Sequence, residues 1–130
     1  MNFLKNIFKS NLKATEVKKT NVNWIPLTTL EEIEKVKEAS KASAVAIFKH
    51  STRCGISRMV IKQFENSFTE DMKEIKVYYI DLLNNRELSN EVGYAFQVLH
   101  QSPQLLVVKN EEAVAYASHY DILNVNLKSF

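Results

Sequence analysis

A cysteine at the end of an apolar run is the residue of this sequence best placed to do chemistry. Cys54 is the only cysteine in 130 residues. It follows the apolar run 44–48 and precedes a helical pattern that begins near Ile56. We therefore expect the thiol at a strand-to-helix turn, where backbone N–H groups and the helix dipole favour an anion. Such a position favours a nucleophilic thiolate.

Several basic side chains surround this cysteine in the sequence. Arg53 and Arg58 flank it, and Lys49 and His50 lie just upstream. Nearby cations stabilise a thiolate, so the sequence favours the reactive form in a second way. The alternative is that Cys54 is a small buried hydrophobe, as lone cysteines often are. Spacing alone leaves both interpretations open.

The remaining chemically active side chains indicate scaffold rather than catalysis. His50 and His100 lie beside predicted strands, where a hydrogen-bonded scaffold role is favoured over acid–base work. Asp81 ends a predicted strand and is expected to be a cap or turn residue. No His, Cys and carboxylate spacing indicates a metal site, and two glycines make no phosphate loop. A single cysteine excludes an intramolecular disulfide and suits a reducing, cytoplasmic compartment.

The charge is distributed unevenly along the chain. Residues 1–20 contain five lysines and one glutamate, so the rest of the chain is slightly acidic although the total is +2. This pattern is not that of a nucleic-acid-binding domain. We interpret residues 1–22 as a basic amphipathic arm and linker before a single domain over 23–130. The apolar face within residues 1–12 permits contact with a membrane surface, but folding back on the domain is the favoured alternative.

Hydrophobic periodicity predicts alternating strands and helices. The predicted strands are 23–27, 43–49, 75–80, 104–109 and 113–118. The predicted helices begin at a cap on Thr28 or Thr29 with Glu31 or Glu32 completing a capping box, at Ile56, at a cap on Asn84 or Asn85, and at Asp121. This order predicts an α/β fold with parallel strands joined by helices and a terminal antiparallel hairpin.

Two motifs within this order resemble the thioredoxin-like superfamily. Cys54-Gly55-Ile56-Ser57 resembles the Cys-x-x-Cys redox motif with serine in the second position, and Ser102-Pro103 directly precedes the hairpin. In that superfamily a cis-proline occupies the latter position and faces the catalytic sulfur. The resemblance implies a thioredoxin-like fold, with a central mixed sheet, a C-terminal hairpin and helices on both faces.

More closely, residues 23–120 resemble the monothiol bacilliredoxins, the YtxJ family of bacillithiol-system proteins. The resemblance rests on residues 48–57, Tyr78-Tyr79-Ile80-Asp81-Leu82 and 100–104. It implies that Cys54 attacks protein mixed disulfides of bacillithiol and takes over the small thiol. A second thiol must then release it, because Ser57 cannot. No permanently bound cofactor is implied; the partners are S-thiolated client proteins and the small thiol.

The resemblance also assigns roles around the sulfur. Ser57 is expected either to donate a hydrogen bond to Cys54 or to satisfy backbone groups in the first helical turn. The arginines at 53 and 58 are expected to attract the carboxylates of the small thiol, with solvated charge as the alternative. Thr52, Ser102 and Pro103 are expected to bind substrate, the Ser102 backbone by pairing with it as an added strand.

Two other functions remain open from the sequence. Cys-Gly-Ile-Ser differs by one residue from the Cys-Gly-Phe-Ser of monothiol glutaredoxins, which share a [2Fe–2S] cluster between subunits, although the double glycine of those proteins is missing here. The third hypothesis is a non-catalytic adaptor that docks through its basic N-terminus.

Overall fold

The computed structural model describes residues 20–130, which form one five-stranded mixed sheet. The strands lie in the order β1-β3-β2-β4-β5; β1 and β2 pair parallel with β3, and β4 pairs antiparallel with β2 and β5. Their bounds are Asn23–Pro26 (β1), Val45–His50 (β2), Lys76–Asp81 (β3), Gln104–Lys109 (β4) and Glu112–Ser118 (β5). The predicted parallel strands and C-terminal hairpin are confirmed.

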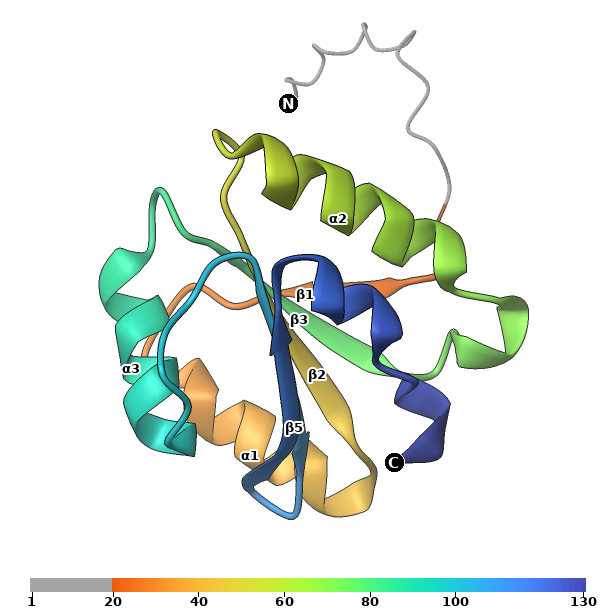
Figure 1. The fold of residues 1–130 in the computed structure, drawn as a ribbon. Helices are drawn as coiled ribbons and strands as arrows, with labels where there is room; N and C mark the ends of the chain where they lie inside the picture. The colour runs from red at the N-terminus through yellow and green to blue at the C-terminus, as the bar shows by residue number, and fades with distance from the viewer. Residues whose placement is uncertain (1–19) are drawn as a thin grey trace, which may run out of the picture.

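Helices cover both faces of the sheet (Figure 1). The helices α1 (Glu32–Ala42) and α3 (Arg86–Phe96) pack on one face, and α2 (Gly55–Ser67) packs on the other with the short helix η2 (His119–Asn124). A further short helix, η1 (Glu70–Met72), follows α2. Each face therefore has its own apolar core, and the sheet separates the two.

The central strand β2 is buried at all six positions because β3 and β4 flank it and helices cover it. Side chains alternate between the two faces of a strand. Ile47 belongs to the core beneath α1 and α3, whereas Phe48 belongs to the core beneath α2. The next two residues, Lys49 and His50, therefore point to opposite sides of the sheet.

Polar side chains fix two turns that lead into helices. The Glu32 carboxylate accepts hydrogen bonds from the N–H groups of Thr28 (2.8 Å) and Thr29 (3.1 Å), which also lower its pKa. This is one half of the predicted capping box, but the predicted cap on Thr28 or Thr29 is wrong. The N-cap residue is Glu31, and its side chain makes no capping hydrogen bond within residues 20–130. Asp81 accepts from the Leu83 N–H and the Asn84 side chain, which confirms its predicted turn role.

The predicted helix beginning at Asp121 is wrong. The chain forms two short 3-10 helices, η2 and η3 (Leu127–Ser129), separated by an extended Val125. The Asn126 side chain accepts a hydrogen bond from the Lys128 N–H, a local contact that competes with a continuous helix. Ile122 and Leu127 are still buried against the sheet. The apolar spacing therefore predicted which residues are buried, but not the kind of helix that they form.

The packed part of the chain begins before the predicted boundary at residue 23. Val22 is buried in the core beneath α2, and the Asn21 side chain donates a hydrogen bond to the Phe68 carbonyl at 3.1 Å. The predicted amphipathic segment 1–12 lies outside the described residues. Within residues 20–130, no helix has the length and apolar character that spanning a membrane requires.

Candidate active site

Cys54 is the N-cap residue of α2 and is partly exposed. It follows β2 after the three residues 51–53, which confirms the predicted strand-to-helix turn. The first N–H groups of a helix have no partners within the helix and can stabilise an anion there. Partial exposure is inconsistent with the alternative of a fully buried small hydrophobe.

Residues 51–54, which we call the cysteine loop, are held by hydrogen bonds to themselves and to α2. The Cys54 N–H donates to the Ser51 carbonyl at 3.2 Å, and the Arg58 N–H donates to the Cys54 carbonyl at 3.0 Å. The Arg58 guanidinium also donates to the Thr52 carbonyl at 3.1 Å. A methyl group placed on Gly55 would lie 3.9 Å from the same guanidinium. Arg58 therefore lies directly against the cysteine loop.

The other basic residues do not share this position. Arg53 is exposed and has no ion pair or hydrogen bond within residues 20–130. The expectation that Lys49 supports the thiolate is wrong. It is fully buried on the α3 side of the sheet, whereas Cys54 begins α2 on the other side. Alternation along β2 explains this placement.

Lys49 instead belongs to a buried polar cluster. Its ammonium lies 3.2 Å from His100 Nδ1, and the Ser89 hydroxyl lies 3.3 Å from the same nitrogen. Burial lowers the pKa of Lys49 to about 8. Burial, with Lys49 and Arg86 nearby, also lowers the pKa of His100. These contacts are consistent with the predicted hydrogen-bonded scaffold role of His100. The cluster itself was not predicted from the sequence; a lysine in a strand predicted to be buried on both faces was its one signal.

Ser57 is fully buried in the first turn of α2. Its hydroxyl oxygen accepts a hydrogen bond from the Ser51 N–H at 3.0 Å and lies 2.7 Å from His50 Nδ1. Within residues 20–130 its hydroxyl makes no hydrogen bond to Cys54. Of the two expected roles of Ser57, the contacts fit the satisfaction of backbone groups. His50 is hydrogen-bonded, which is consistent with its predicted scaffold role.

The Ser102–Pro103 peptide bond is cis, as the resemblance implied. Pro103 is buried, and its carbonyl accepts a hydrogen bond from the His119 N–H at 3.0 Å. Gln104, the next residue, pairs with Lys49 across the antiparallel strands β4 and β2. The C-terminal end of β2 lies beside the N-terminal end of β4. The cysteine loop and Ser102–Pro103 therefore lie at the same end of the strands. The Ser102 hydroxyl is buried there and has no hydrogen-bond partner among residues 20–130.

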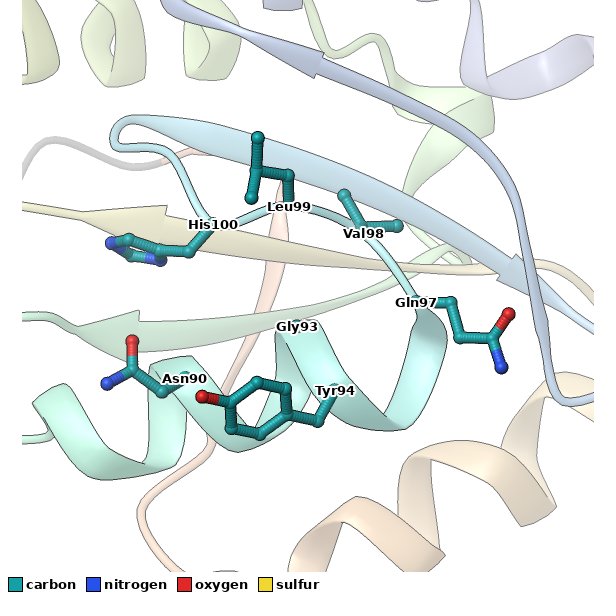
Figure 2. A pocket seen from close by; sticks show the side chains of 7 residues that line it. All are labelled: Asn90, Gly93, Tyr94, Gln97, Val98, Leu99 and His100. Carbon is teal, nitrogen blue, oxygen red and sulfur yellow. The ribbon is translucent and has the colours of Figure 1, made fainter.

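A groove of about 470 Å³ lies beside the segment that leads to this proline. Figure 2 shows Asn90 and Tyr94 on α3 opposite Val98, Leu99 and His100. Leu99 is 83% exposed, whereas Val98 is buried, so Leu99 is the apolar side chain that this segment presents to solvent. None of the residues predicted to act in catalysis or substrate binding lines this groove.

The family follows from a match that spans most of the described chain. Residues 25–127 match the family model described as monothiol bacilliredoxin BrxC. The chain belongs to the monothiol bacilliredoxin family. This membership and the fold make it a thioredoxin-like thiol oxidoreductase with a single cysteine.

Solved structures support the same fold. A protein described as a proposed oxidoreductase with a thioredoxin fold is 31% identical, with a TM-score of 0.66, over 82% of this chain and 89% of its own. The thioredoxin of Malassezia sympodialis is 20% identical, with a TM-score of 0.61, over 82% and 85%. The thioredoxin of Schistosoma mansoni is 18% identical, with a TM-score of 0.65, over 86% and 99%. The two thioredoxins show the fold alone.

Proposed function

We propose that this chain removes bacillithiol from protein mixed disulfides through Cys54, as a monothiol thiol–disulfide oxidoreductase. The observation that supports this most is the placement of its single thiol. The thiol is partly exposed at the start of α2, with the Arg58 guanidinium against its loop. Ser57, at the position of a second cysteine, is buried and occupied by other partners. The arrangement therefore suits one nucleophilic sulfur without an internal resolving thiol.

The proposed reaction has two exchange steps. The Cys54 thiolate attacks the small-thiol sulfur of the mixed disulfide; a bond forms between these sulfurs, and the client protein leaves as a thiolate that takes a proton from water. A second small-thiol molecule, as thiolate, then attacks the small-thiol sulfur bound to Cys54. This step releases the Cys54 thiolate and a symmetrical small-thiol disulfide. In sum, the client's mixed disulfide and one free small thiol become the client thiol and one symmetrical small-thiol disulfide.

In this proposal, the residues that contact substrate lie at the end of the sheet where β2 ends and β4 begins. Arg58, fixed by Thr52, and the exposed Arg53 attract the carboxylates of bacillithiol. The Ser102 backbone, placed by Pro103 before β4, pairs with the client chain near the sulfur. The partners in this proposal are S-thiolated proteins and a low-molecular-weight thiol in the cytoplasm, with no permanently bound cofactor.

The test offers the protein mixed disulfides of one client with bacillithiol and with glutathione, and follows release of the client thiol. We expect turnover that depends on free small thiol, a preference for bacillithiol, and loss of transfer in Cys54→Ser. A preference for glutathione would contradict the bacillithiol assignment and leave the reaction class intact. Anaerobic reconstitution that yields a coloured protein would favour the [2Fe–2S] carrier, and inertness in both assays would favour the adaptor.

A further inference from the structure

His50 is a buried titratable group that the proposed reaction does not use. It is the last residue of β2 and is 6% exposed. Its ring packs against the rings of Phe48 and Tyr79, and it borders a cleft of about 350 Å³ between α2 and strands β1 and β3. Its Nδ1 atom faces the other way, toward Ser57 Oγ at 2.7 Å.

The contacts of Ser57 connect this ring to the cysteine loop. A serine hydroxyl offers one donor and two acceptor sites. One acceptor site receives the Ser51 N–H at 3.0 Å, and within residues 20–130 His50 is the other hydrogen-bond partner of this fully buried oxygen. A buried hydroxyl that loses a hydrogen-bond partner costs free energy. Without His50, the Ser57 hydroxyl is therefore held less firmly in its position beneath the cysteine loop.

The Ser51 backbone in turn determines where Cys54 lies. Its carbonyl accepts the Cys54 N–H at 3.2 Å, so Ser57 fixes one side of the Ser51 residue and Cys54 is bound to the other. A series of contacts thus runs from His50 through Ser57 and Ser51 to the backbone of Cys54. All of it lies within residues 50–57, yet it joins the end of a strand to the first turn of a helix.

We propose that His50 is a positioning residue for Cys54, which acts by holding Ser57 and hence the cysteine loop at the start of α2. This inference rests on the proposed function, because it assumes that Cys54 is the reactive group. It assigns His50 no contact with substrate. Its effect is to hold the backbone of Cys54 at the N-cap position of α2, the helix terminus at which a thiolate is favoured.

The surroundings of His50 keep this contact uncharged near neutral pH. Burial lowers the pKa of His50, and Arg58 acts in the same direction, whereas Asp81 on β3 and Glu65 on α2 oppose the shift. Tyr79 of β3 is also packed against the ring, and burial raises its pKa. The neutral ring can accept the Ser57 proton or donate its own, and either direction preserves the contact.

The test measures the rate of Cys54 alkylation by iodoacetamide from pH 5 to 10 in the full chain. The variants are Ser57→Ala, His50→Leu, the double variant, and His50→Asn, whose side-chain amide can take the place of Nδ1. We expect about tenfold slower alkylation at pH 7 for each of the first two, with the pH profile displaced to higher pH. The double variant should be no slower than the single ones, and His50→Asn should stay within about threefold of wild type. Tyr116→Asn, at an exposed ring on β5, is the control.

Alkylation needs no disulfide substrate, so it judges the positioning role separately from the transfer reaction. Wild-type alkylation in His50→Leu, additive effects in the double variant, or equal impairment of His50→Asn and His50→Leu would each overturn the proposal. A lowered melting temperature with an unchanged pH profile would do so too, because it indicates structural support only. If His50→Leu does not fold, slow alkylation in Ser57→Ala with fast alkylation in His50→Asn still supports the proposal, and the reverse overturns it.

Discussion

Arg58 is the cation that the fold places against the sulfur's loop, and its role depends on two contacts. One is the hydrogen bond from its guanidinium to the Thr52 carbonyl; the other is the close approach to Gly55. An arginine fixed in this way supplies a positive charge at a defined place, whereas the exposed Arg53 has no partner within residues 20–130. The sequence predicted two flanking arginines but could not distinguish them, because the difference lies in where each side chain folds back.

Replacing Arg58 with Gln is expected to slow alkylation of Cys54 at pH 7 by about threefold, since exposed charge interactions contribute up to about 1 kcal/mol. The rate should also lose part of its dependence on salt concentration. Arg86→Gln, the same change at an exposed site on α3, is the control and should alkylate as wild type. Equal alkylation rates in wild type, Arg58→Gln and Arg86→Gln would contradict a role for Arg58 in stabilising the thiolate.

At the scale of elements, the connection from α3 to β4 sets the position of the cis-proline. Helix α3 ends at Phe96, its C-cap residue Gln97 has a positive φ of 58°, and the Val98 N–H then donates to the Gly93 carbonyl at 2.9 Å. A Cβ atom on Gly93 would lie 2.9 Å from the Val98 carbonyl oxygen. The glycine inside the predicted helix therefore has a packing reason that periodicity alone does not reveal.

Gly93→Ala is expected to destabilise the protein by about 1–3 kcal/mol in urea unfolding, because a side chain there overpacks against the backbone at Val98. It should also raise the KM for the mixed disulfide, since displaced residues 98–101 lead directly to Ser102–Pro103. Helix propensity alone predicts the opposite sign, a gain of up to about 1 kcal/mol. A more stable variant would therefore contradict the packing argument.

For the whole molecule, the order of elements could be predicted, whereas the polar contacts between elements could not. Apolar periodicity predicted β2, α2 and the turn at Cys54 because one face of each element must be buried. It could not pair Lys49 with His100, which is 51 residues away, or show that these residues lie on the opposite side of the sheet from the sulfur. The same periodicity predicted one continuous helix where the chain forms the short helices η2 and η3. Their apolar residues are buried as expected, but local hydrogen bonds interrupt the helix.

The buried Lys49 predicts how stability depends on pH. The pKa of Lys49 is about 8 in the folded protein, against an ordinary value of 10.5 that applies to the unfolded chain. Between these pH values the unfolded chain binds more protons than the folded protein, so stability rises with pH there. Below pH 8 the buried charge weakens the fold by up to about 3 kcal/mol. Lys49→Met should therefore be more stable than wild type in urea at pH 7, with the difference shrinking toward pH 10. Lys62→Met, at an exposed site on α2, is the control; a difference that does not change with pH would contradict the assignment.

The most direct test of small-thiol transfer to Cys54 is the mass of the protein after a single turnover with substrate. The reduced chain is mixed with a protein–bacillithiol mixed disulfide in the absence of free small thiol, quenched with acid and measured by intact mass spectrometry. We expect a gain of one bacillithiol, located on Cys54 by peptide mapping, with release of one client thiol per chain. Client thiol released without an adduct on Cys54, or a chain that stays unmodified and leaves the substrate intact, would contradict it.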